Sequence, residues 1–290
     1  MSYKRVLLVI LIISISGLLV YFLAQMEQSA MQQTAASRPI PLPYNWIGSI
    51  TKKQIAEPSG ITYHPVRRSL FIADDSGSVH EVDLHGIFIQ AKGVNELDIE
   101  GITMDPSTGL LYAAVEDDEA IIELDPETLA IQRKFRIARD FEGELLLKKG
   151  GMGIEAIAFV PDALHPEGGT FWVGNQSFSL KTTAEPSVVC EVLVPLRSET
   201  AAISEVSIIN AYKMNFIDIS GLAYDPQDDV LVLISDTTNL LVEMNREGTI
   251  LSKYLLPGDE QEGVTLDGHG YMYIAQESGT IIKLGDRRLR

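Results

Sequence analysis

One short pattern recurs along this chain, and it constrains the fold more than any other feature. Each copy places an acidic or small polar residue before Gly or Ala, continues with alternating hydrophobic residues, and usually ends in Asp-Pro or a related turn. The copies occupy residues 57–65, 98–106, 153–161, 218–226 and 260–267. Their Gly or Ala residues fall at positions 60, 101, 156, 221 and 263, so the spacings are 41, 55, 65 and 42 residues. Self-similarity at this period indicates a repeat architecture.

Short hydrophobic runs follow each copy, and they predict the internal structure of the repeat. The second runs span 70–73, 111–115, 171–173, 230–234 and 271–275. Third and fourth runs include 79–84, 121–124 and 240–244, then 131–137 and 250–256. All are rich in Val, Ile, Tyr and Phe and are bounded by turn-forming residues, which is typical of strands joined by tight turns. Four strands at this period predict the blade of a β-propeller.

The ends of the repeat region predict how such a ring closes. The fifth copy stops after its third strand, near Leu284, whereas the segment 45–51 precedes the first copy and belongs to no blade. If this segment pairs as the fourth strand of the last blade, an exposed sheet edge disappears. We therefore predict an all-β fold over residues 44–290, a five-bladed β-propeller with an N-terminal strand closing the last blade.

The N-terminus predicts a membrane anchor. Residues 6–24 carry no charge and follow Lys4 and Arg5. A helix of this length is about 29 Å long, enough to cross a bilayer core. A cleaved signal peptide is the alternative, but Phe22 stands where its cleavage site requires a small residue. We predict one transmembrane helix within residues 1–24 and a flexible tether over 25–43, which is rich in Gln, Ala, Ser and Pro.

The basic residues before this span predict its orientation. Because positive charge favours the cytoplasmic side, the N-terminus would stay inside. The rest of the chain would then lie on the periplasmic or extracytoplasmic side of the inner (plasma) membrane of a bacterium, as a single-pass protein.

Charge narrows the classes of partner. The chain has 40 acidic and 23 basic residues, a net charge of -17. This balance excludes a nucleic-acid binder, whose affinity depends on basic residues that neutralise phosphates. Cys190 is the only cysteine, so the chain forms no internal disulfide. Cations are the expected partners.

Oxygen-bearing side chains recur at two blade positions that a propeller brings to one face around its axis. The first set, at the start of the first strands, is Ser59, Glu100, Glu155, Ser220 and Glu262. The second set, at the end of the second strands, is Asp74, Glu116, Asn175, Asp236 and Gln276. We expect the residues of the second set, with Ser59 and Ser220, to line a ligand-binding mouth.

Three carboxylates of the first set predict a metal site. Glu100, Glu155 and Glu262 would repel one another on a common axis unless a cation or protons neutralise them. Calcium accepts about six to eight oxygen ligands in irregular geometry, so we expect these three residues to bind calcium. Zinc fits poorly, because the histidines fall in different turns. The alternative is a solvated acidic rim that binds nothing.

The repeated motif, the anchor and two acidic runs resemble a known family. The runs are Ile72-Ala73-Asp74-Asp75-Ser76-Gly77 and Asp98-Ile99-Glu100-Gly101. With the motif, they resemble the SdiA-regulated (YjiK-like) family of membrane-anchored bacterial β-propellers, which are distantly similar to NHL-repeat proteins. The resemblance implies a five-bladed, calcium-binding fold. The family name records a transcriptional link and no biochemical activity.

Three functions are consistent with these features. The first is a binding or sensing module that holds a small molecule or protein at the propeller mouth. The second is a calcium-dependent hydrolase, similar to phytases, lactonases or esterases, in which the metal polarises the substrate and Glu116 or Asp236 acts as base. The third is a protein-interaction scaffold. The sequence leaves open whether the protein is an enzyme.

Overall fold

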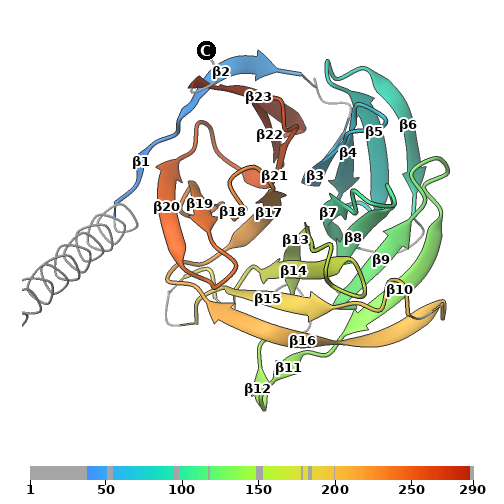
Figure 1. The fold of residues 1–290 in the computed structure, drawn as a ribbon. Helices are drawn as coiled ribbons and strands as arrows, with labels where there is room; N and C mark the ends of the chain where they lie inside the picture. Colours follow the sequence, from blue (N-terminus) through green and yellow to red (C-terminus); the bar gives the residue numbers. More distant parts are fainter. Residues whose placement is uncertain are drawn as a thin grey trace, which may run out of the picture.

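The computed structural model describes residues 38–50, 55–94, 98–116, 118–147, 153–177, 179–181, 185–198 and 200–287. The regular elements in these ranges are β-strands (Figure 1). In this part of the chain no helix is long and apolar enough to cross a membrane. The predicted anchor, residues 6–24, and residues 25–37 of the predicted tether lie outside it.

The strands form antiparallel units of four, each starting with one copy of the repeated motif. The first unit contains β3 (Pro58–His64), β4 (Ser69–Asp74), β5 (Ser78–Asp83) and β6 (Phe88–Gly93). The second contains β7 (Ile99–Met104), β8 (Leu111–Val115), β9 (Ala120–Leu124) and β10 (Ile131–Ile137). The third contains β13 (Ile154–Pro161), β14 (Gly169–Asn175), β15 (Val188–Leu193) and β16 (Ile203–Lys213). The fourth contains β17 (Ile219–Asp225), β18 (Val230–Ser235), β19 (Leu240–Met244) and β20 (Ile250–Leu255). The last contains β21 (Gln261–Leu266), β22 (Tyr271–Gln276) and β23 (Thr280–Asp286), with β2 (Tyr44–Ser49) as its outer strand.

The units are arranged around a common axis, as in a β-propeller (Figure 1). The first strand of every unit lies innermost, and β3, β7, β13, β17 and β21 contact one another in a closed ring. Outer strands are separated from the axis by the rest of their own sheet. Loops at both ends of the innermost strands therefore surround the axis, one set on each face.

The ring closes through the predicted strand pairing and through a second pairing that was not predicted. β2 pairs antiparallel with β23, as expected for the segment 45–51. β1 (Ile40–Pro41) pairs in parallel with the outer strand β20, and Leu42 is buried in the core between these units. The fold therefore begins before the predicted end of the tether at residue 43, because these apolar residues cover the edge of β20. One N-terminal segment thus joins the fourth and last units.

A second seam joins two units through their outer strands. β16 pairs antiparallel with β15 and, through its first residues, in parallel with β10. The result is one eight-stranded sheet across the second and third units. The short hairpin of β11 (Asp140–Phe141) and β12 (Glu144–Leu145) projects beyond this seam (Figure 1).

Buried aromatic and aliphatic side chains fill the space between neighbouring units. Tyr112 and Trp172 are each 1% exposed and belong to these cores. Cys190 is fully buried there, and burial raises the pKa of its thiol to about 12. This thiol is therefore a packing group rather than a nucleophile.

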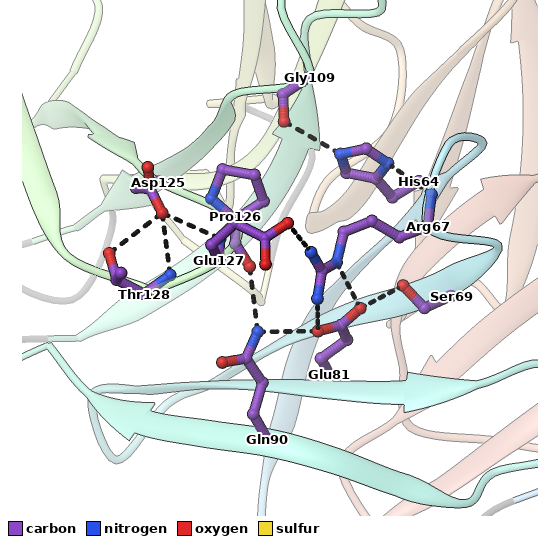
Figure 2. Close-up of polar contacts among 10 residues, drawn as sticks. All are labelled: His64, Arg67, Ser69, Glu81, Gln90, Gly109, Asp125, Pro126, Glu127 and Thr128. Atoms are coloured by element: carbon purple, nitrogen blue, oxygen red, sulfur yellow. Dashed lines mark hydrogen bonds and ion pairs between the residues drawn. The ribbon is translucent and has the colours of Figure 1, made fainter.

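A buried carboxylate also links the first unit to the second (Figure 2). Glu81 accepts hydrogen bonds from Arg67, Ser69 and Gln90, and Gln90 also donates to the carbonyl of Pro126 at 3.0 Å. Arg67 reaches across to pair with Glu127. This network satisfies the buried charge of Glu81, as a buried ion pair requires.

Candidate functional site

A β-bulge occurs at the same place in the innermost strand of every unit. The pairing between first and second strands shifts between Pro58 and Gly60, and likewise at the four equivalent positions. The residues at the five breaks are those of the first predicted set, Ser59, Glu100, Glu155, Ser220 and Glu262. A bulge removes one residue from the ladder and re-aims its side chain. The repeated motif therefore determines the direction of these five side chains.

The small residue that follows each bulge forms a narrow waist around the axis. A Cβ atom added to Gly60 would lie 2.8 Å from Cα of Gly101, and one added to Gly263 would lie 2.9 Å from Cα of Gly60. The backbones of neighbouring units thus touch at this level. A cavity of about 10 Å³ remains between them. The waist separates the acidic face from the opposite end of the axis.

Backbone hydrogen bonds show which residues at the ends of the second strands stand beside the bulges. The amide groups of one residue per unit donate to a carbonyl two residues before the bulge. The donors are Asp75, Glu116, Gln176, Asp236 and Glu277, and the acceptors are Glu57, Asp98, Gly153, Asp218 and Glu260. Glu116 and Asp236 are therefore structurally equivalent to Asp75 and Glu277. The second predicted set therefore contains residues from two adjacent positions, the last residue of the second strand and the first residue after it.

The other members of that set form hydrogen bonds to nearby backbone groups. One carboxylate oxygen of Asp74 accepts from the amide of Ala56 at 3.1 Å. Asn175 Oδ1 accepts from the amide of Val188 at 2.6 Å. Gln276 Nε2 donates to the carbonyl of Asp259 at 2.6 Å. These side chains fix the loops on which the acidic residues stand.

The two serines of the first set connect neighbouring units. Ser59 Oγ donates to the carbonyl of Ile99, and Ser220 Oγ donates to the carbonyl of Gln261 at 2.6 Å. Both serines are buried. Their hydroxyl groups hold together the backbones that carry Glu100 and Glu262.

The three glutamates lie in one electrostatic environment. Burial, followed by the nearby Asp98, raises the pKa of Glu100 to about 9. Burial raises the pKa of Glu262 to about 9, and Asp236 and Asp218 add to this shift. Burial also raises the pKa of Glu155 well above its usual value, with further contributions from Glu100 and Glu116. Close, desolvated carboxylates of this kind hold protons or bind a cation.

Three rings of equivalent positions make up the acidic face. They are the bulge residues, the five amide donors beside them and the five carbonyl acceptors before them. Carboxylates occupy eleven of these fifteen positions, and no Lys or Arg occurs at any of them. Four acidic residues of the acceptor ring were not among the predicted site residues. They are Glu57, Asp98, Asp218 and Glu260. Acidic residues two positions before four of the five bulges are a signal that the sequence contains.

Three of these carboxylates are close enough to share a metal ion. Ligand atoms of Asp75, Asp98 and Glu100 all lie within 4.8 Å of one another. Asp98 raises the pKa of Asp75 to about 6. These residues come from two neighbouring units, so the group lies at the junction of the first and second units. The structure thus places Glu100 at this group, with Asp75 and Asp98 as partners that the predicted metal set lacked.

A glutaminyl cyclase of known structure has a similar fold. Glutaminyl cyclase from Myxococcus xanthus superposes with a TM-score of 0.58 at 11% identity, covering 85% of this chain and 97% of that chain. The Cps50 (Swd1) β-propeller domain of Myceliophteria thermophila matches with a TM-score of 0.48 at 12% identity, covering 84% of this chain and 99% of that chain.

No curated protein matches this chain in sequence. A family model does match, and it covers nearly all of the propeller, residues 47–283. The chain belongs to the SdiA-regulated family.

Proposed function

We propose that this protein is a five-bladed β-propeller that binds calcium at its acidic face and acts there as a binding or sensing module. The blade number is supported by the closed ring of β3, β7, β13, β17 and β21. The membrane anchor predicted over residues 6–24 would place the propeller outside the cytoplasm, attached to the inner membrane.

The observation that carries the calcium proposal is the concentration of carboxylates with no basic residue among them. Eleven acidic side chains stand on three adjacent rings, and three of their number already lie within the span of one ion. Calcium tolerates irregular sets of six to eight oxygen ligands, whereas magnesium requires near-octahedral geometry. Backbone carbonyls and water would complete the shell around Asp75, Asp98 and Glu100.

A binding module needs nothing beyond this arrangement. A bound cation would neutralise the mouth, fix the loops that carry the carboxylates and offer open coordination positions to an oxygen-bearing ligand. The likeness to glutaminyl cyclase, at 11% identity, extends to the fold. The two bases considered for hydrolysis accept backbone amide bonds, Glu116 from Gly153 and Asp236 from Gln261. Their geometry therefore supports a loop-fixing role.

Calorimetric titration of the purified full-length chain with calcium tests this proposal. We expect a saturable site whose affinity falls at least about tenfold in Glu100→Gln, because one charged ligand is lost. Glu127→Gln is the matched control, since Glu127 is exposed and pairs with Arg67 far from the acidic face. Unchanged titrations of both Glu100→Gln and Glu155→Gln would show that the carboxylates are only a solvated rim.

A further inference from the structure

The second half of the repeated motif builds a pocket on the face opposite the acidic rings. Beyond the waist, the hydrophobic residues of the motif turn toward the axis from every unit. They enclose a cavity of about 340 Å³. This volume lies within the range of about 300 to 1,000 Å³ that is usual for small-molecule sites.

One position of the motif supplies the wall of this pocket. The wall residues, three positions after the small residue in each copy, are Tyr63, Met104, Phe159, Tyr224 and Leu266. Ile61 and Ile102, which follow the waist glycines directly, form part of the floor. The wall of the pocket is therefore mainly aromatic and apolar and lies on the innermost strands, and turns that follow these strands form the rim.

The charged groups of the pocket are all acidic. Asp225, Asp267 and Asp286 line it, and no Lys or Arg is among its lining residues in the described part of the chain. Asp225 Oδ1 accepts from the amide of Gln227 at 2.8 Å, and Asp267 Oδ1 accepts from the amide of Tyr271 at 3.0 Å. These bonds hold both carboxylates in place before any ligand arrives.

Electrostatics of the wall agree with this placement. Burial raises the pKa of the Tyr63 hydroxyl, and the negative charge of Asp267 raises it further. Two basic side chains stack on wall or rim rings without lining the pocket. Arg246 lies over Tyr224, and Lys283 Nζ lies 4.3 Å from the centre of the Tyr271 ring. An aromatic surface beside fixed carboxylates attracts a cation both through the ring faces and through charge.

We propose that this pocket binds a small organic cation, an ammonium compound whose apolar body fills the cavity and whose charged group lies beside Asp225 and Asp267. The apolar wall favours an organic cation over an inorganic one, because a small hydrated ion would leave this wall in contact with water. The carboxylates and the absence of lining basic residues disfavour anions. This site is separated from the calcium site by the waist, and it does not depend on the proposed function of the acidic face.

A matched ligand series tests the proposal on the full-length chain. The probes are 4-phenylbutylamine, 4-phenylbutanol and 4-phenylbutyrate, which share one apolar body and differ in the charge of the head group. Calorimetry at neutral pH, in saturating calcium, should show the amine binding about tenfold more tightly than the alcohol and the carboxylate binding most weakly. Equal affinities, or no binding by any of the three, would overturn the proposal.

Variants locate the binding. Asp225→Asn with Asp267→Asn retains the turn-forming oxygen and removes the charge, so the preference for the amine over the alcohol should disappear. Asp83→Asn is the control, because Asp83 accepts similar turn amides, from His85 and Ile87, outside the pocket. Glu262→Gln should leave amine binding unchanged. Amine binding that Glu262→Gln weakens, and that the pocket variant does not, would assign the cation to the acidic face and contradict the proposal.

Discussion

At the scale of single residues, a difference of one position at the end of a strand separates a structural role from a functional one. Asp74 and Asp75 are adjacent, yet Asp74 is 2% exposed and accepts bonds from loop amides, whereas Asp75 is exposed and stands with Asp98 and Glu100. Asp74 is the last residue of β4, and Asp75 is the first residue of the turn that follows. Gln276 and Glu277 show the same division, since Gln276 is buried and donates to the carbonyl of Asp259, whereas Glu277 is exposed.

This division predicts different phenotypes for two neighbouring substitutions. Asp75→Asn should weaken calcium binding about tenfold, because it removes a charged ligand from the group of three. Asp74→Asn should leave calcium affinity within about twofold and lower the free energy of unfolding by about 1–3 kcal/mol, since an amide nitrogen would face the Ala56 amide. Calcium calorimetry and urea denaturation measure the two effects. Equal losses of calcium affinity in both variants would contradict the assignment.

The sequence predicts the chemistry of the site better than its register. The acidic residue before each Gly or Ala is visible by inspection, and the structure places it at a bulge in every unit. Glu116 and Asp236 were aligned one residue away from their structural equivalents, because hydrophobic runs alone do not show at which residue each second strand ends. The acceptor ring, including Asp98, was missed although four of its five positions are acidic in the sequence.

At the scale of elements, the innermost strands are shaped by how closely they approach one another. Gly60 and Gly263 leave no space for a side chain at the waist, and the bulge before each of them turns the preceding side chain aside. Local pattern was sufficient to predict the first two strands of each unit and some of the outer strands. It did not predict β1 on β20 or β10 beside β16, since these parallel edge pairings depend on which units become neighbours in the ring.

The close approach at the waist predicts an unequal response to glycine substitution. Gly60→Ala places a Cβ 2.8 Å from Cα of Gly101, so the ring must widen, and we expect a loss of about 1–3 kcal/mol in the free energy of unfolding. Gly93→Ala in β6 meets nothing within 4 Å, and we expect a change within about 1 kcal/mol or a slight gain. Chemical denaturation compares the two. Equal stability of both variants would show that the waist is not tightly packed.

At the scale of the whole molecule, one face gathers negative charge that the rest of the chain does not balance. Glu277 illustrates the continuity of the rings, since its pKa is raised by burial and then by Glu260 and by Glu57 from the first unit. The charge therefore forms a connected network around the axis. A cation or bound protons must stabilise it, and pH decides between them.

The raised pKa values set the sign of the pH dependence. In the metal-free protein, Glu100 and Glu262 have pKa values of about 9 in the fold, against 4.5 ordinarily. Between these values the folded state holds protons that the unfolded chain has lost, so stability falls as pH rises. Burial lowers the pKa of His64 and His80, which acts in the opposite direction but only up to about pH 6.5. The carboxylates should therefore dominate above about pH 7.

Thermal melts of the full-length chain check this sign. With chelator present, the melting temperature should fall from about pH 7.5 to about pH 9, and the fall should be smaller in Glu262→Gln, which carries no proton to lose. With calcium present, the fall should vanish or reverse, because the metal binds the deprotonated carboxylates and stabilises only the folded state. A melting temperature that rises with pH in chelator would mean that the folded protein holds no extra protons on these carboxylates, so that they are ionised and solvated without a cation.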